Sequence, residues 1–256
     1  MKTVIYVGKY ERQFSQDLLL KPKAMLEIGD LPILWHIMKH YASYGFKDFI
    51  LLCSYKPYAV KEFFFNYSLH HCDVTIDLKN RVFTPLKNDT EDFKVTIIDV
   101  GKNTNTGGAL KKAQEIIGNE PFMFTYGDGL SDIDLNLLLS HHLRHKKMIT
   151  ISAISASQKY GMIDFNDNGS VIGFKEKEMT DSIVNGGFMV CNSDVFDLID
   201  DDPSTIFEKE PMVTAVACHQ VTAYHHHGFW RAVDNYEDLD ELNKLYESNK
   251  APWNCY

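Results

Sequence analysis

The strongest constraint on the fold is an alternation of short apolar runs and helical patterns over the first 145 residues. Four runs are typical of buried strands, because each is short, apolar and followed by a polar or glycine-containing loop: 3–7, 48–53, 94–99 and 121–126. Apolar residues at helical spacing separate or follow these runs over 33–44, 58–67, 108–117 and 133–145. Parallel strands joined by helices need helices on both faces of their sheet. This half therefore predicts an α/β fold with a Rossmann-like, mostly parallel sheet flanked by helices.

After residue 145 the predicted strands follow one another more closely. They cover 148–154, 161–165, 171–175, 184–190 and 220–225, and Asn-Asp-Asn-Gly at 166–169 is a strong hairpin-turn sequence. Helical patterns cover 195–199, 211–217 and 236–247. Nothing polar and flexible marks a boundary near residue 150. We therefore expect one domain over 1–256, with an antiparallel extension of the sheet and with 1–145 and 146–256 as its two halves.

Charge and composition exclude several classes of protein. Lysine and arginine number 26 against 35 aspartates and glutamates, so the net charge is −9. Such an acidic chain is a poor candidate for binding nucleic acid or an anionic membrane without specificity. No apolar run approaches the roughly 18 residues of a membrane span. Five scattered cysteines without a C-x-x-C pair argue against a zinc site or a disulfide framework, which favours a cytoplasmic location.

A carboxylate between two glycines stands at the end of the fourth predicted strand, in Tyr126-Gly127-Asp128-Gly129. In open α/β sheets, ligands bind outside the carboxyl ends of the strands. Magnesium is usually held there by one or two carboxylates together with substrate phosphates. The alternative is a turn aspartate or a helix N-cap before Ile133, although Ser131 and Asp132 are better placed as caps. The residues alone leave both interpretations of Asp128 open.

Other candidate groups are weaker when each is taken alone. Lys21 and Lys23 would supply positive charge for phosphates, but most lysines are simply solvated. Asp234 precedes a predicted helix, and its position favours an N-cap over a metal ligand. The remaining candidates are Thr106-Gly107-Gly108 at a helix start, Glu176-Lys177 at a strand end and Asn185-Gly186 at a strand start. A metal site at His225-His226-His227 is disfavoured, because neighbouring side chains in a strand point to opposite faces.

Taken together and in this order, these pieces resemble the sugar-nucleotide nucleotidyltransferase family, and its cytidylyl-transferring members most of all. The resemblance runs nearly from end to end, so it is far more specific than any single motif. It is carried by the sequences at 21–29, 32–38, 55–56, 106–108, 124–129, 176–177, 185–188, 228–230, 234 and 250–253.

The resemblance implies a reaction in which an oxygen of a sugar 1-phosphate attacks the α-phosphorus of CTP or another nucleoside triphosphate and releases pyrophosphate. It implies that Asp128 and Asp234 hold Mg²⁺ and that Lys23 steadies the triphosphate or the charge of the transition state. It implies that Lys177 holds the acceptor phosphate. The other implied contacts are Gly8, Gly107 and Gly108 toward the nucleotide, with Thr106 beside them, and Gly161, Glu176, Asn185 and Gly186 toward the acceptor. It also suggests a homo-oligomer.

The chain departs from the family pattern in the loop after its first strand. The family has G-G-x-G-T-R there, whereas this chain has Gly8-Lys9-Tyr10-Glu11-Arg12-Gln13, with one glycine of three. The arginine that usually follows T-G-G is Ala109, and the proline after Glu-Lys is Glu178. One hypothesis is an active enzyme in which Lys9 and Arg12 rebuild the triphosphate contacts. The others are a catalytically degenerate relative with a binding or regulatory role, and a module that binds sugar phosphates only.

Overall fold

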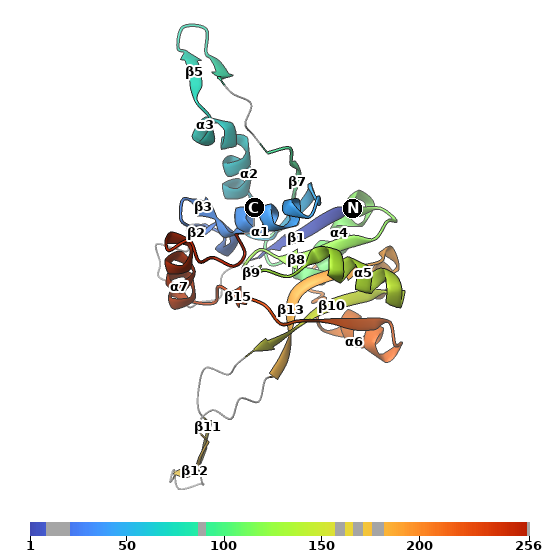
Figure 1. The fold of residues 1–256 in the computed structure, drawn as a ribbon. Helices are drawn as coiled ribbons and strands as arrows, with labels where there is room; N and C mark the ends of the chain where they lie inside the picture. The colour runs from blue at the N-terminus through green and yellow to red at the C-terminus, as the bar shows by residue number, and fades with distance from the viewer. Residues whose placement is uncertain (9–20, 87–90, 157–161, 166–170, 176–181, 255–256) are drawn as a thin grey trace.

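A seven-stranded mixed sheet organises the chain (Figure 1). The computed structural model describes residues 1–8, 21–86, 91–156, 162–165, 171–175 and 182–254. The strand order is β14-β10-β13-β8-β1-β4-β7. The bounds are β1 Lys2–Val7, β4 Asp48–Cys53, β7 Lys94–Asp99, β8 Phe122–Tyr126, β10 Ile149–Ala156, β13 Ser182–Cys191 and β14 Val221–His226.

The sheet has a parallel part and an antiparallel extension, as the sequence predicts. Strands β8, β1, β4 and β7 run parallel, and β13 joins β8 in the antiparallel direction. Strand β10 is antiparallel to β13, and β14 runs parallel to β10. One sheet therefore takes strands from both sides of residue 145.

Helices cover both faces of this sheet. The described helices are α1 Ile33–Ser43, α2 Pro57–Phe65, α3 Tyr67–His71, α4 Thr106–Ile117, α5 Leu135–His145, α6 Glu210–Ala217 and α7 Tyr236–Glu247, with 3₁₀ turns η2 Lys23–Met25 and η3 Ser193–Leu198. Helices α1, α5 and α7 contribute to the apolar cluster on one face of the sheet, and α4 and α6 to that on the other. The sequence pattern at 195–199 therefore forms a 3₁₀ turn and not an α-helix. None of the helices in the described ranges is both long and apolar enough to cross a membrane.

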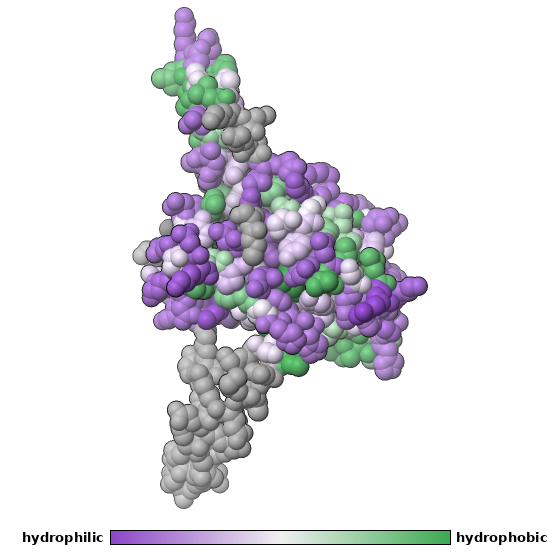
Figure 2. All heavy atoms as spheres, in the orientation of Figure 1, coloured by the Kyte–Doolittle hydropathy of each residue, from purple (hydrophilic) through white to green (hydrophobic). Residues whose placement is uncertain are grey.

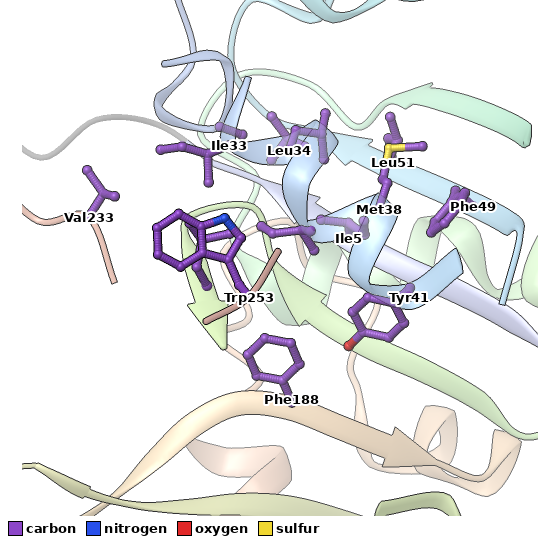
Figure 3. Packing of buried hydrophobic residues seen from close by; sticks show 14 of the residues in the cluster. Ile5, Ile33, Leu34, Met38, Tyr41, Phe49, Leu51, Phe188, Val233 and Trp253 are labelled. Atoms are coloured by element: carbon purple, nitrogen blue, oxygen red, sulfur yellow. The ribbon is translucent and has the colours of Figure 1, made fainter. Parts of the chain in front are cut away.

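Two apolar clusters fill the space between sheet and helices. Val4 and Ile5 are neighbours in β1 and belong to opposite clusters, because successive strand side chains point to opposite faces. The first cluster joins Ile5 to α1, β13 and the C-terminal Trp253 (Figure 3). The second joins Val4 to α4, η3 and α6. Burial on both faces explains why the β1 sequence is apolar almost throughout.

Four short two-stranded sheets complete the described structure. The pairs are β2 Glu27–Ile28 with β3 Leu31–Pro32, β5 Val74–Asp77 with β6 Val82–Pro85, β9 Gly129–Ser131 with β15 Trp230–Ala232, and β11 Met162–Phe165 with β12 Val171–Lys175. The sequence predicts only the β11–β12 hairpin. Helices α2 and α3 lead to the β5–β6 hairpin, and this segment extends away from the sheet (Figure 1).

Both helix caps expected near the aspartates are wrong. Helix α5 is capped by Asp134, whose Oδ1 accepts from the Leu137 amide at 2.8 Å. Helix α7 is capped by Asn235 and not by Asp234. In each case the cap lies one to three residues later than expected, which leaves the preceding acidic side chains available for other contacts.

Candidate active site

The carboxyl ends of β1 and β8 lie side by side and position Asp128. The Gly127 amide donates to the Tyr6 carbonyl at 2.9 Å, which carries the parallel pairing one residue beyond β8. A Cβ at Gly127 would lie 2.9 Å from Ala24 Cβ and 3.2 Å from the Tyr6 oxygen. Glycine is therefore required for η2 to rest on this turn, and that contact brings Lys23 to Asp128.

The β9–β15 ribbon places the second aspartate beside the first. Gly129 lies opposite Ala232, and the Val233 amide donates to the Asp128 carbonyl at 2.9 Å. Asp128 and Asp234 thus stand at the same end of the ribbon. Lys23 Nζ donates to both, at 2.8 Å to Asp128 Oδ2 and 3.1 Å to Asp234 Oδ1.

Lys23 holds its positive charge between the two carboxylates. Its side chain is only 14% exposed, whereas Asp128 is 32% and Asp234 is 73% exposed. Burial by itself would lower the pKa of Lys23, but the charges and hydrogen bonds of Asp128 and Asp234 outweigh it and the pKa is raised. The ammonium group therefore relieves the repulsion between two carboxylates that share one site.

The chemistry of this pair suits a hard divalent cation. Two convergent carboxylates offer the oxygen ligands that Mg²⁺ prefers, and magnesium usually completes its shell with waters and substrate phosphates. Within the described ranges, no three His, Cys, Asp or Glu side chains gather closely enough to hold a metal ion by themselves. The donor set thus fits a magnesium ion that arrives with a phosphate ligand.

The buried carboxylate of Asp238 holds the backbone of Asp234 in place. Asp238 is 3% exposed and accepts from Arg231 Nη1 at 3.0 Å and from the Asp234 amide at 3.1 Å. Arg231 also contacts Glu241 at 2.7 Å. No sequence motif predicts this support. The available indication was an acidic residue four positions after Asp234, in the first turn of the following helix.

A second polar cluster joins the end of β8 to the start of α4. Glu208 accepts from Thr106 Oγ1 at 2.7 Å and from the Tyr126 hydroxyl. Burial, followed by the charge of Glu208, raises the pKa of Tyr126 well above its usual value, so the phenol stays protonated. Nearby, the Tyr6 hydroxyl donates to the Thr104 carbonyl at 2.7 Å. Glu208 was not anticipated, because the sequence around it matches no recognised motif.

Helix α4 begins at Thr106, two residues before the predicted helical range 108–117, and its first amides already have an acceptor. The Gly107 and Gly108 amides donate to the Thr205 carbonyl at 3.0 and 3.1 Å. A Cβ at Gly108 would lie 2.7 Å from the Asp202 carbonyl oxygen. The glycine pair thus lets the chain around Thr205 pack against the helix start. A role for Thr106, Gly107 and Gly108 toward a nucleotide stays a prediction.

The acceptor-side residues that the structure describes lie where β13 approaches β8. The Asn185 side chain accepts from the Gly187 amide at 2.9 Å, and the Gly186 carbonyl accepts from Trp230 Nε1 at 2.7 Å. Gly187 has a φ of +79°, and a Cβ there would lie 2.6 Å from the Tyr126 ring. Gly8 directly follows β1, whose last residue is Val7. Five other predicted site residues lie outside the described residues: Lys9, Arg12, Gly161, Glu176 and Lys177.

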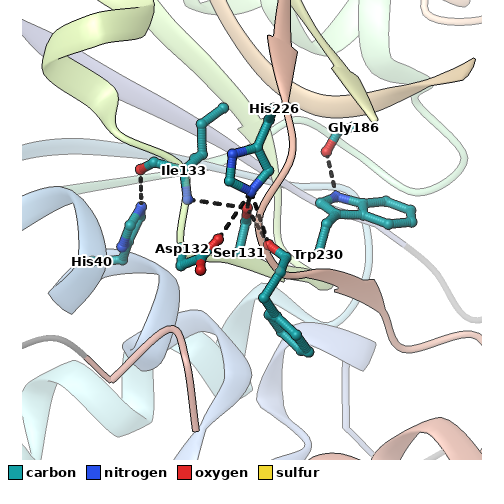
Figure 4. Close-up of polar contacts among 8 residues, drawn as sticks. His40, Ser131, Asp132, Ile133, Gly186, His226 and Trp230 are labelled. Atoms are coloured by element: carbon teal, nitrogen blue, oxygen red, sulfur yellow. Dashed lines mark hydrogen bonds and ion pairs between the residues drawn. The ribbon is translucent and has the colours of Figure 1, made fainter. Parts of the chain in front are cut away.

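A buried histidine, His226, lies at the end of the β9–β15 ribbon opposite Asp128 and Asp234, and it contacts the chain beside both strands (Figure 4). His226 Nε2 lies 2.9 Å from Asp132 Oδ1 and 3.1 Å from the Phe229 carbonyl. At the next residue along the chain from Asp132, His40 Nε2 contacts the Ile133 carbonyl at 2.9 Å. Burial lowers the pKa of His40 to about 4, so its ring is neutral at pH 7. These contacts fix the ribbon that carries both site aspartates.

Comparison with known proteins agrees with this geometry. The family model described as nucleotidyl transferase matches residues 19–251. The chain is 41% identical to the glucose-1-phosphate cytidylyltransferase of Salmonella typhimurium and 37% identical to the probable glucose-1-phosphate cytidylyltransferase of Bacillus subtilis, in each case over 100% of both chains. A solved structure of a putative glucose-1-phosphate thymidylyltransferase from Bacillus anthracis superimposes with a TM-score of 0.68 at 14% identity, covering 96% of this chain and 95% of that one.

The match of the family model over most of the chain, the full-length identity to the two curated relatives and the shared fold all lead to the same conclusion. The two aspartates and the lysine also lie together, as the family resemblance led us to expect. The chain belongs to the nucleotidyl transferase family.

Proposed function

We propose that this protein transfers a cytidylyl group from CTP to a sugar 1-phosphate of the glucose 1-phosphate class and releases pyrophosphate. The observation that carries the proposal is the convergence of Asp128 and Asp234 on Lys23 at the carboxyl end of the central strands. Full-length identity of 41% to a glucose-1-phosphate cytidylyltransferase supports the choice of substrates. The acceptor oxygen forms a bond to the α-phosphorus as the bond to the leaving pyrophosphate breaks.

Asp128 and Asp234 would hold Mg²⁺ in this reaction. The ion, when bound, neutralises phosphate charge, which is what phosphoryl-type transfer chiefly needs. The protein contributes a preformed pair of carboxylates and a lysine that keeps its charge beside them. The ribbon and Asp238 hold these groups in place, so little reorganisation is needed when the substrates bind.

The two halves of the chain would divide the substrates within one domain. Gly8, Lys9, Arg12 and Thr106-Gly107-Gly108 are proposed to contact the nucleotide. Gly161, Glu176, Lys177, Asn185 and Gly186 are proposed to contact the acceptor. The hydrogen bond from Thr106 to Glu208 and that from Trp230 to Gly186 tie these regions to other parts of the chain. We also propose that the enzyme is a homo-oligomer.

One feature favours a second function. The loop from Gly8 to Gln13 has one glycine and an acidic residue where relatives of this family cradle the triphosphate with glycines. A protein with this loop could have lost turnover and kept a binding or regulatory role. Such a protein would show no pyrophosphate release and negligible calorimetric binding of triphosphates, whereas micromolar binding of CTP contradicts it.

Pyrophosphate release tests the proposal directly. With CTP, glucose 1-phosphate and Mg²⁺, Asp128→Asn and Asp234→Asn should each lower kcat by about two orders of magnitude or more, because each removes a carboxylate from the metal site. Asp48→Asn is the matched control, since Asp48 is the first residue of β4 and so lies at the opposite end of the parallel strands from Asp128, and both side chains are 32% exposed. Absence of pyrophosphate across a panel of nucleotides and phosphorylated acceptors would overturn the proposal.

A further inference from the structure

We propose that Glu208 is a positioning residue for the sugar phosphate: its carboxylate fixes the side chain of Tyr126, and the Tyr126 ring holds the part of β13 that carries Asn185 and Gly186. The inference rests on the proposed function, because Asn185 and Gly186 are the acceptor contacts proposed above. Glu208 lies two residues before α6 and acts through Tyr126, without touching either substrate.

Two hydroxyl groups hold the Glu208 carboxylate, one at each oxygen. The Tyr126 hydroxyl donates to Oε1, and Thr106 Oγ1 donates to Oε2 at 2.7 Å. The Thr106 oxygen also accepts from the Phe207 amide at 2.9 Å, which directs its own proton toward Glu208. The carboxylate therefore has a defined place beside the carboxyl end of β8.

Aromatic side chains of the second apolar cluster surround this carboxylate. Phe207 is completely buried, and its ring meets the Phe124 ring edge to face with 5.6 Å between the centroids. The Phe124 ring meets Tyr126 in the same way at 5.5 Å. These rings pack inside the protein, whereas exposed apolar residues gather on the projecting segment of α2, α3 and the β5–β6 hairpin in Figure 2. Glu208 thus has a closely packed support that keeps it in place.

The ring of Tyr126 packs directly on the backbone of Gly187. A Cβ at Gly187 would lie 2.6 and 3.0 Å from two carbons of the ring, so the ring fills the space of a side chain at this position. Gly187 also has a φ of +79°, which glycine adopts at little cost. Any turn of the Tyr126 ring therefore changes what supports Gly187.

Gly187 lies in a bulge of β13 next to the proposed acceptor contacts. Three residues of this strand, Gly186–Phe188, lie opposite Ser152 alone in the pairing with β10. Bulges often occur beside active sites, where they redirect a side chain. The Gly187 amide donates to Asn185 Oδ1 at 2.9 Å, and Trp230 Nε1 donates to the Gly186 carbonyl at 2.7 Å (Figure 4). Two aromatic side chains, Tyr126 and Trp230, thus hold the bulge.

The charge of Glu208 strengthens its bond to Tyr126. Burial and then this charge raise the pKa of Tyr126 well above its usual value, so the phenol keeps its proton and donates it to the carboxylate. Without the carboxylate, the ring loses the bond that fixes its orientation against Gly187. The Asn185 side chain would then lose the fixed position of the amide that it accepts from.

The test measures binding of glucose 1-phosphate to the full-length protein by isothermal titration calorimetry. Mg²⁺ and saturating α,β-methylene CTP are present, and the methylene bridge of this analogue prevents release of pyrophosphate. Tyr126→Phe keeps the ring and removes the hydroxyl. It should raise the Kd for glucose 1-phosphate about tenfold, since one charge-assisted hydrogen bond is lost. The Kd of the CTP analogue, titrated separately, should stay within about twofold.

Glu208 is tested alone and together with Tyr126. Glu208→Leu should raise the Kd for glucose 1-phosphate as much as Tyr126→Phe does, and the double variant should raise it no further, because both changes remove the same bond. Glu208→Gln should keep this Kd within about threefold of the wild-type value, since its amide oxygen still accepts from Tyr126. If Glu208→Leu does not fold, Glu208→Ser, whose side chain is too short to reach Tyr126, tests the same bond.

Tyr6→Phe is the matched control. Tyr6 lies directly opposite Tyr126 in the pairing of β1 with β8, and its hydroxyl donates to the Thr104 carbonyl at 2.7 Å. Its removal should leave the Kd for glucose 1-phosphate unchanged, because the bond to Glu208 and the contact with Gly187 both belong to Tyr126.

The inference predicts a change in sugar-phosphate affinity alone, whereas a merely structural role would lower Tm and weaken both ligands equally. A wild-type Kd for glucose 1-phosphate in Tyr126→Phe, or equal rises in the Kd values of both ligands, would overturn it. A wild type that does not bind glucose 1-phosphate would overturn it as well. Because binding is measured without turnover, a protein that binds both ligands but releases no pyrophosphate from CTP would refute only the proposed reaction.

Discussion

Lys23 lies at the centre of the site because its ammonium group joins two carboxylates that come from distant parts of the chain. The sequence offers Lys23, Asp128 and Asp234 as candidates, and the structure brings the three side chains together. The sequence alone could not show that they meet, and its own logic favoured an N-cap for Asp234. The decisive information is the register of two three-residue strands, β9 and β15, which no local pattern reveals.

Removing the charge of Lys23 should slow turnover and at the same time strengthen the binding of Mg²⁺ to the protein without nucleotide. We expect Lys23→Gln to lower kcat by about two to three orders of magnitude, because a cation aimed at the phosphates is lost. Without nucleotide, the same variant should gain a larger rise in Tm on addition of Mg²⁺ than the wild type, because the ammonium group no longer competes for the carboxylates. Thermal unfolding with and without Mg²⁺ measures this, and an equal or smaller rise would contradict the arrangement.

His40 should make stability depend on pH in the acidic range. Its folded pKa of about 4 lies below the roughly 6.5 of an unfolded histidine, so the unfolded chain binds a proton that the native one does not. Stability from this group is complete above pH 6.5 and is lost as the pH falls toward 4. Its loss between pH 7 and pH 5 should be about 2 kcal/mol.

Urea unfolding of wild type and His40→Gln at pH 7 and pH 5 measures this contribution. The variant should be less stable at pH 7, since the contact with the Ile133 carbonyl is altered, but its stability should change less with pH. The other buried histidines, which include His36 and His142, remain in both proteins and cancel in the comparison. Equal pH dependence of the two proteins would show that His40 is not buried in its neutral form.

At the scale of elements, burial decides what the sequence could predict. The parallel strands were predicted because both faces of β1, β4 and β8 are covered and their residues are therefore apolar. Strands β5 and β6 were missed because they are short and largely exposed. The start of α4 was predicted to within two residues from its glycines, but their close contact with the chain near Thr205 depends on tertiary packing.

Trp230 links the ribbon that carries the aspartates to the strand that carries Gly186. Trp230→Phe keeps an aromatic ring and removes the hydrogen bond to the Gly186 carbonyl. We expect the KM for the sugar phosphate to rise about tenfold while the KM for CTP stays within about twofold, because only the acceptor side loses its anchor. Steady-state kinetics with each substrate varied in turn measures both values.

Trp35→Phe is the control for that experiment. Trp35 belongs to α1, and its ring stacks on Tyr67 and meets the Phe63 ring edge to face. Its replacement should lower Tm and leave both KM values unchanged. If Trp230→Phe raised both KM values equally, the indole would serve general stability and not the position of β13.

At the scale of the whole molecule, the net charge of −9 lies outside residues 57–86, which carry three cations and three anions. The net charge of −9 excluded polyanionic partners from the start, and it also sets how two copies should respond to salt. Raising NaCl from about 50 to 500 mM shortens the Debye length from roughly 14 to 4 Å, which screens the repulsion between two copies of the acidic chain. The dissociation constant of the oligomer should therefore stay constant or fall. Sedimentation at the two salt concentrations measures this, and marked dissociation at high salt would indicate a contact built from ion pairs.

The central claim, that a sugar phosphate attacks the α-phosphorus of CTP, is tested most directly by isotope transfer. Glucose 1-phosphate labelled with ¹⁸O in its phosphate group is incubated with CTP, Mg²⁺ and the enzyme. The masses of the products are then measured by mass spectrometry. Nucleotidyl transfer predicts a cytidine diphosphate sugar that keeps the complete label and pyrophosphate that carries none. Label in the pyrophosphate, or no nucleotide sugar at all, would contradict the account.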